Sequence, residues 1–395
     1  MNVSKILGGE FMNREDFKML QDNSLIYFDN GATTLKPNCV VNEIVDYYTK
    51  YCANAHRGDY HNSMIVDEKY ESVREKIKEF INARNKSEIV FTSGATDGLN
   101  RIVFGYFKNI LKKDDEVLLT EAEHASNVLP WFALANEIGI KIKYIPLNEI
   151  NEVTIDNVEK SITSKTKVIS LAYLTNVIGD IRPMRDICEL AHKNNILVVG
   201  DGAQSLSHIK TDVIVDDIDF LVASAHKMYG PTGVGFLYGK FHLLNEMKPI
   251  NYGGGMNAMY LSDGYIELRE VPTRFEAGTQ NIAGVIGMGF AIDYLSKIGL
   301  NKIIKYEHEL RDYLVNDVQV GLSLESSQTN SRSAFKTLYI HFDKYDKKVL
   351  SIYMENKETI YKIEYIDKDI SQLVYRIDYP NKIDNIEEEN IKAVK

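Results

Sequence analysis

The sequence predicts an α/β fold built on a mostly parallel sheet, followed by a smaller α+β domain, and two observations support this prediction. From about residue 88, short apolar runs alternate with longer stretches of helical periodicity, which is the pattern of strands joined by helical crossovers. Several of these runs are apolar on both faces, as strands are when helices cover both sides of a sheet.

Seven segments of this region are predicted to be strands because each is a short apolar run. They cover residues 88–92, 115–120, 140–147, 167–174, 196–201, 219–225 and 234–239. Between the fourth and the fifth, the stretch Pro183–Asn195 begins with proline and has apolar residues at helical spacing, so we expect a helix there.

The pattern changes after about residue 285. Two long helices, a polar loop and two strand-like runs are expected there, at 282–299, 303–318, 323–333, 336–342 and 372–379. The acidic run 385–390 is interpreted as a solvated helix face. We therefore expect a large domain over 25–285 and a small domain formed by 1–24 and 286–395.

Composition excludes several function classes. The formal net charge of -10 argues against binding to nucleic acid or to an anionic membrane surface, because both need clustered Lys and Arg. No apolar run reaches the roughly 18 residues of a membrane span, and the first residues lack the apolar core of a secretory signal. Three cysteines give no disulfide framework. We expect a cytoplasmic protein.

Charged side chains end two neighbouring strands of the predicted sheet, where open α/β sheets form their ligand sites. Asp201 ends one apolar run and Lys227 follows the next. Burying either group costs free energy unless it is paired or loses its charge. Each has a structural alternative, since Asp201 could cap a helix and Lys227 could reach solvent.

Two further segments end strands with polar groups. Residues 91–100 run from a strand through a turn of small residues into a helix, whose first N–H groups and the Thr96 hydroxyl could hold a phosphate. His124 follows another strand end. Each feature alone has a structural interpretation. The turn is equally well explained as a helix cap, and the histidine as a surface residue.

One chemistry accounts for all four features. A phosphate-holding turn, a buried aspartate, a histidine and a strand-end lysine are the parts of a pyridoxal phosphate site. There the lysine forms a Schiff base with the cofactor aldehyde, which explains how its burial is tolerated. The aspartate keeps the pyridine nitrogen protonated, so that the ring can accept electrons.

The chain also resembles a known family. Seven motifs, in order over about residues 25–320, are similar to those of the class V aminotransferase family, and most of all to its group II cysteine desulfurases. They are YFDNGATTLKP, NAHRGDYHNS, TEAEHASNVLPW, LTNVIG, GDGAQS, ASAHKMYGPTGVG and TRFEAGTQN. The resemblance implies fold type I, pyridoxal phosphate as cofactor, and a homodimer with active sites at the subunit interface.

The resemblance also implies roles for individual residues. Lys227 would be the Schiff-base lysine, Asp201 would contact the pyridine nitrogen, and His124 would stack on the ring. Gln204 and Asn176 would lie near the phenolic oxygen of the cofactor and the substrate. The cofactor phosphate would be held by Ala95, Thr96, Ser224 and His226, and by Thr279 of the second subunit. Arg376 and Arg57 would bind the substrate, Arg376 through its carboxylate.

The chain departs from the desulfurase pattern at the nucleophile. Group II enzymes have a cysteine in an Arg-x-Gly-His-His-Cys-Ala motif, and the corresponding stretch 356–376 contains no cysteine. Cys52, which precedes the NAHRG motif, is the best substitute, whereas Cys39 and Cys188 read as small core residues. Ala125 stands where group II enzymes have a second histidine.

With the cofactor site intact and the thiol missing, three functions compete. The first, which the sequence favours, is transamination between a small amino donor, such as glutamate or alanine, and an unidentified keto acceptor, with Lys227 moving the proton. The second is a cysteine or selenocysteine lyase, or a desulfurase-like enzyme without a persulfide cysteine. The third is a subunit that binds the cofactor without turnover, which the intact Asp201 and Lys227 argue against.

Overall fold

The computed structural model describes residues 14–21, 27, 29–56 and 58–316, and six short strands between 349 and 394. It divides into two compact units, one of residues 34–301 and one of residues 1–33 with 302–395. The predicted division at residue 285 falls inside helix α10 (Ile282–Ile298). The predicted domain boundaries stay a prediction.

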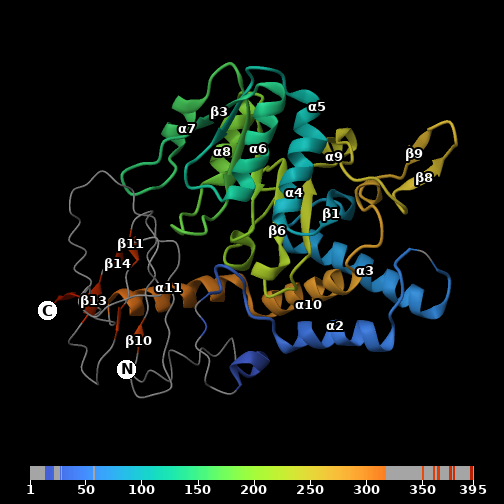
Figure 1. The fold of residues 1–395 in the computed structure, drawn as a ribbon, viewed down its shortest axis with the longest axis horizontal. Coiled ribbons are helices and arrows are strands. Elements are labelled where there is room, and N and C mark those ends of the chain that lie inside the picture. Colours follow the sequence, from blue (N-terminus) through green and yellow to red (C-terminus); the bar gives the residue numbers. More distant parts are fainter. Residues whose placement is uncertain are drawn as a thin grey trace. The chain divides into compact units, whose positions relative to one another are not determined.

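A seven-stranded sheet forms the centre of the larger unit, and all seven predicted strands are confirmed (Figure 1). The strands are β1 (Ile89–Thr92), β2 (Glu116–Leu119), β3 (Lys141–Tyr144), β4 (Thr166–Ala172), β5 (Leu197–Asp201), β6 (Phe220–Ser224) and β7 (Gly235–Gly239). Their order is β1-β7-β6-β5-β4-β2-β3. Only β7 runs antiparallel to its neighbours in this sheet, so the predicted mostly parallel α/β fold is confirmed.

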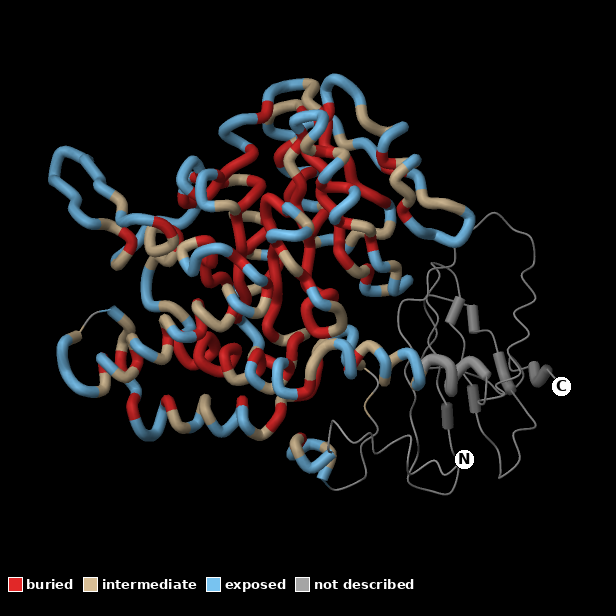
Figure 2. The backbone as a smooth tube through the Cα atoms, turned by 180° about the vertical axis from the view of Figure 1, so that it is seen from behind, coloured by how far each residue is buried: buried red, intermediate tan, exposed pale blue. Residues whose placement is uncertain are grey.

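Helices cover both faces of the sheet because its strands are apolar on both sides. On β6, Phe220 and Val222 belong to a core cluster with helices α4 (Ala95–Arg101) and α6 (Ala125–Ile138), and Leu221 between them is equally buried toward the other face. The predicted helix at 183–195 is α8 (Met184–Lys193), which packs against β5. In Figure 2 the inner strands of the sheet are buried, whereas the edge strand β3 (Lys141–Tyr144) is mostly exposed.

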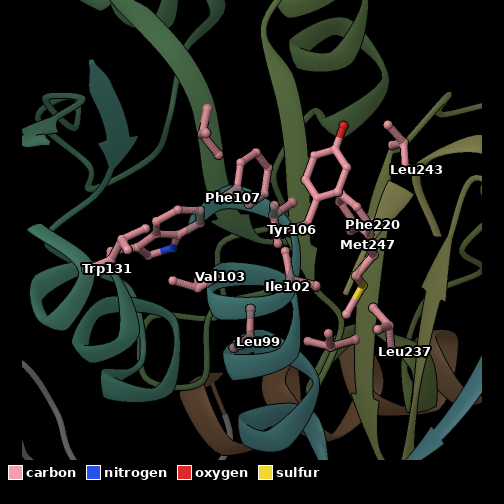
Figure 3. Packing of buried hydrophobic residues seen from close by; sticks show 14 of the residues in the cluster. Leu99, Ile102, Val103, Tyr106, Phe107, Trp131, Phe220, Leu237, Leu243 and Met247 are labelled. Atoms are coloured by element: carbon pink, nitrogen blue, oxygen red, sulfur yellow. The ribbon is translucent and has the colours of Figure 1, made fainter. Parts of the chain in front are cut away.

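Aromatic side chains fill the cluster between the sheet and α4 (Figure 3). α4 continues as a π-helical stretch, Ile102–Phe107, whose Phe107 ring lies 5.2 Å from Trp131 of α6 and 6.0 Å from Phe220 of β6. All three rings are fully buried. This packing fixes α4, and with it the turn that precedes it, against the end of β6.

The remaining helices of the larger unit pack beside the sheet. They are α2 (Asn38–Lys50), α3 (His61–Phe80), α5 (Lys108–Ile110), α7 (Ile155–Ser161), α9 (Phe241–Glu246) and α10. α10, predicted at 282–299, contacts both α2 and α3, and the three lie side by side in Figure 1. A hairpin of β8 (Asn257–Tyr260) and β9 (Ile266–Leu268), which the sequence analysis missed, extends away from the sheet.

The second predicted long helix is α11 (Leu300–Asn316). The run expected at 372–379 contains β13 (Leu373–Tyr375) and β14 (Ile377–Asp378); the other short strands are β10 (Val349–Leu350), β11 (Thr359–Ile360), β12 (Ile363–Glu364) and β15 (Lys392–Val394). The loop expected at 323–333, the strand at 336–342 and the acidic run 385–390 lie outside the described residues.

Among the described helices, none alone has the length and apolar character to cross a membrane. One bent pair, Ile282–Ile298 with Leu300–Leu310 at 73°, reaches that length and composition together.

Candidate active site

The carboxyl ends of the central parallel strands bring the predicted site residues to one edge of the sheet. Asp201 is the last residue of β5, and Lys227 lies in a short 3-10 turn, Ala225–Lys227, directly after β6. β5 and β6 are parallel neighbours, with Asp201 opposite Val222. His124 follows β2 and begins α6 at the same edge. The three side chains lie near enough for the charge of each to shift the pKa of at least one other.

Asp201 is a buried carboxylate, only 5% exposed. Its Oδ1 accepts a hydrogen bond from the Ala203 N–H at 2.9 Å. Burial raises the pKa of Asp201, and this N–H together with the charges of Lys227 and His124 opposes that rise. One backbone N–H does not offset the burial of a charge, so the carboxylate needs a cation beside it.

Lys227 is the amine that faces Asp201. Burial lowers the pKa of Lys227, and the Asp201 carboxylate opposes the shift. A lysine whose pKa is lowered by burial has a larger share of neutral, nucleophilic amine at neutral pH. This is the state that attacks an aldehyde and that accepts a proton.

His124 is held in a defined orientation. Its Nδ1 accepts a hydrogen bond from the Ser126 N–H at 3.1 Å, which caps α6 and leaves the proton of the neutral ring on Nε2. The residue is exposed overall, but the partial enclosure of its ring and the charge of Lys227 lower its pKa. A neutral ring can lie against another ring and can exchange a proton through Nε2.

Hydroxyl groups gather where the phosphate is expected. The buried Ser224, the last residue of β6, accepts a hydrogen bond from the Ala95 N–H through Oγ at 2.7 Å, so its own hydrogen can be donated elsewhere. The Thr96 hydroxyl lies 2.8 Å from the Ser126 hydroxyl, which joins the first turns of α4 and α6. Gly94 precedes them at φ +148, and a Cβ there would lie 3.2 Å from Ser224 Oγ.

Two lysines influence the titration of His226. Its pKa is lowered by burial and by the charges of Lys227 and Lys36. The lowered pKa favours the neutral imidazole, which has one N–H and one acceptor nitrogen.

The other predicted residues differ in what the structure describes. Gln204 is buried just after β5, whereas Asn176 is exposed in a turn after β4. Thr279 is exposed, and its hydroxyl accepts a hydrogen bond from Asn54 Nδ2 at 3.3 Å. This contact joins two of the motifs, NAHRG and FEAGTQN, within one chain. Arg57 and Arg376 lie outside the described residues.

Of the two cysteines predicted in the core, one is there. Cys188 is buried in α8, and Cys52 is exposed after α2. The prediction that Cys39 is a core residue is wrong, because Cys39 is exposed. Helix α2 has apolar residues on more than one side, with Val41 42% and Val45 50% exposed, so helical periodicity did not identify its inner face.

A buried ionic cluster behind His124 was not predicted. The fully buried guanidinium of Arg182 contacts Asp180 Oδ2 through Nε at 2.7 Å and Glu123 Oε1 through NH1 at 3.6 Å. Glu123 also accepts hydrogen bonds from the Ala172 N–H at 2.7 Å and Asn127 Nδ2 at 3.0 Å. The cluster ties the end of β4 and the start of α6 together directly beside His124. A glutamate next to a strand-end histidine was the one signal for it in the sequence.

This arrangement fits pyridoxal phosphate. A protonated pyridine nitrogen is the cation that the buried Asp201 needs, and Lys227 beside it is an amine for the aldehyde. The side chains of Ser224, Thr96 and His226 are of the kinds that would donate hydrogen bonds to its phosphate.

Comparison with known proteins agrees with the fold and identifies the family. The family model described as Aminotransferase class-V matches residues 26–361. A probable cysteine desulfurase from Halalkalibacterium halodurans is 42% identical over 293 residues, 74% of this chain and 72% of that one. The apo structure of a cysteine desulfurase from Thermococcus onnurineus NA1 is similar at a TM-score of 0.73 and 37% identity, over 76% of this chain and 74% of that one.

A more distant structure shows the fold alone. It is a mutant of C-DES with glycine covalently linked to its PLP cofactor, similar at a TM-score of 0.68 and 22% identity, over 77% of this chain and 79% of that one. The fold type I architecture predicted from the sequence is thus confirmed. The match to the family model extends over most of the sequence, and the chain belongs to the aminotransferase class-V family, with pyridoxal phosphate as its cofactor.

Proposed function

We propose that the protein is a desulfurase-like C–S lyase that acts on cysteine, or its selenium analogue, without a persulfide cysteine of its own. The 42% identity to a probable cysteine desulfurase over three quarters of the chain is the observation on which this rests. It favours the lyase over the aminotransferase that the sequence alone favoured. The cysteine-free stretch 356–376 removes the thiol that would take the sulfur, so we expect sulfide to leave directly.

The balanced reaction is elimination followed by hydrolysis. Cysteine loses its α-proton and its thiol group, the C–S bond breaks, and the remaining three-carbon unit takes up water to give pyruvate and ammonia. Cysteine and water thus yield pyruvate, ammonia and sulfide, with no external oxidant or reductant. When bound, pyridoxal phosphate supplies an electron sink for the electron pair released at the α-carbon.

Lys227 and Asp201 divide the proton chemistry in this proposal. The amine of Lys227, with its pKa lowered by burial, removes the α-proton as general base. The buried carboxylate of Asp201 would pair with the pyridine nitrogen and keep it protonated. Ser224, Thr96 and His226 would hold the phosphate, with the Ala95 backbone orienting Ser224. Gln204 and Asn176 would lie near the phenolic oxygen and the substrate.

We infer that His124 acts on the leaving group. Its neutral ring has the proton on Nε2 because Nδ1 accepts the Ser126 N–H. We propose that it stacks on the cofactor ring and donates this proton to the departing sulfur, since sulfide leaves more easily as the protonated species.

Transamination is the second candidate. The absence of any cysteine after Cys188 favours it, because transamination needs only Lys227 and the cofactor. The substrates would be a small amino donor and a keto acceptor.

The assembly is also a proposal. We propose a homodimer in which Thr279 completes the phosphate site of the second subunit, and in which Arg57 and Arg376 contact the substrate carboxylate. The larger domain would span 25–285 and the smaller one the remainder.

Product analysis separates the two reactions. We expect purified protein, given L-cysteine without oxygen, to release sulfide and pyruvate in equal amounts and no alanine. We expect Lys227→Ala to abolish the release of sulfide and pyruvate. The matched variant Lys160→Ala, at an exposed lysine paired with Asp156, is expected to retain it. Conversion of alanine or glutamate to its keto acid, with no sulfide from cysteine, would contradict the lyase and support the aminotransferase.

A further inference from the structure

The turn that presents Lys227 is held by a segment far away in the sequence. The carbonyl of His226, directly before Lys227, accepts hydrogen bonds from three donors. They are the Thr34 N–H at 2.9 Å, Thr34 Oγ1 at 3.0 Å and Lys36 Nζ at 3.1 Å. A carbonyl oxygen has two lone pairs, so three donors are more than it ordinarily accepts.

The same segment also holds the other side of the turn. The Tyr229 N–H, two residues after Lys227, donates to Thr34 Oγ1 at 2.8 Å. Tyr229 adopts φ 62, the left-handed region that a bulky residue enters only when its surroundings require it. Lys36 further donates to the carbonyl of Thr34, which closes the segment on itself. Thr34 thereby holds the chain on both sides of Lys227, and Lys36 holds it on the side of His226.

We propose that Lys36 is a positioning residue for Lys227, whose ammonium group fixes the His226 carbonyl and so aims the neighbouring amine at the pyridoxal phosphate aldehyde. The inference rests on the proposed function only in taking this cofactor at Lys227. It does not depend on whether the enzyme releases sulfide or transfers an amino group.

The free-energy cost of burying Lys36 indicates that this residue serves function rather than the stability of the fold. Lys36 is half-buried, and burial lowers its pKa to about 8. A lysine whose pKa is lowered by folding destabilises the folded state at every pH at which the unfolded chain holds the proton. The reason is that folding must either remove water from the charged ammonium group or remove its proton. An apolar side chain of similar length in its place therefore removes this penalty. Positions that lower stability in this way concentrate at functional sites.

The experiment compares two lysines with opposite expected outcomes. In Lys36→Met we expect the melting temperature of the apoprotein to stay equal or rise, and the Kd for pyridoxal phosphate to increase about tenfold, which corresponds to ~1.4 kcal/mol. In Lys240→Met, at the opposite edge of the sheet, we expect a lower melting temperature and an unchanged Kd. Lys240 contacts Asp217 at 2.7 Å and Asp219 at 2.8 Å, so its role is in stability.

A second readout keeps the test independent of activity. Borohydride reduction of the cofactor-saturated protein, followed by peptide mass spectrometry, measures the fraction of Lys227 that is modified. We expect this fraction to fall in Lys36→Met and to recover in part in Lys36→Arg, which restores a cation. An unchanged Kd and an unchanged modified fraction in Lys36→Met would overturn the proposal, as would a loss of apoprotein stability that matches the loss of binding.

Discussion

Replacing Arg182 by methionine tests whether the buried cluster behind His124 is held by charge. Methionine keeps much of the apolar stem and removes the guanidinium. The variant leaves the carboxylates of Glu123 and Asp180, 0% and 7% exposed, without their shared cation. Removing one partner of a buried ion pair destabilises a protein by about 3–5 kcal/mol. With roughly 2–4 °C for each kcal/mol in a domain of this size, we expect the melting temperature to fall by ~10 °C.

The pH dependence of this loss of stability tests the role of charge more specifically than the loss itself does. Burial already raises the pKa of Glu123 and of Asp180, and the charge of Arg182 opposes both shifts. Without Arg182 both carboxyls stay protonated to higher pH in the folded state, while they ionise in the unfolded chain. For each carboxyl, the free energy of unfolding then falls as pH rises from its pKa in the unfolded chain to its pKa in the folded protein, by about 1.4 kcal/mol per pH unit.

The assay is thermal unfolding of both proteins at pH 6 and pH 8. Arg185→Met is the matched control, because Arg185 is exposed three residues away and a surface change there is expected to stay within about 0.5 kcal/mol. Equal losses in the two variants, or a loss in Arg182→Met that does not grow between pH 6 and pH 8, would refute the reasoning.

Three further predictions concern single residues. Asp201→Asn is expected to lower turnover by roughly 10²–10⁴-fold, the range for groups that control a proton, while borohydride still fixes the cofactor on Lys227; turnover near the wild-type value would refute the role of Asp201. His192→Gln is expected to lower stability at pH 6 more than at pH 9. The two ring nitrogens of His192 each lie 2.9 Å from a carboxylate oxygen, one of Asp217 and one of Asp219, and these contacts raise the pKa of His192. The stabilisation is therefore fully present below the pKa of His192 in the unfolded chain and is lost as pH rises through its pKa in the folded protein. Unfolding curves that shift equally at pH 6 and pH 9 would count against this prediction. Cys52→Ser is expected to leave sulfide release from cysteine unchanged, and a loss of that activity would make Cys52 the missing acceptor.

The sheet and its edge could be predicted because both depend on local patterns. The apolar runs predicted the seven strands to within three residues at either end. Asp201, His124 and Lys227 were predicted as site residues because each stands at, or within a few residues of, the end of such a run. A parallel arrangement then brings strand ends together without further information.

The contacts that orient these residues could not be predicted in the same way. Lys36 and His226 are 190 residues apart, and no periodicity links them. Arg182 reads as an ordinary residue before a proline until the fold buries it against Glu123. The exposure of Cys39 was also inaccessible, since it depends on which side of α2 faces α10.

Borohydride trapping of the purified, cofactor-saturated protein tests the central claim most directly. The account predicts one modified peptide, with the reduced cofactor attached to Lys227, and no attachment in Lys227→Ala. Attachment at another lysine, or trapping that persists in the Lys227→Ala variant, would contradict it.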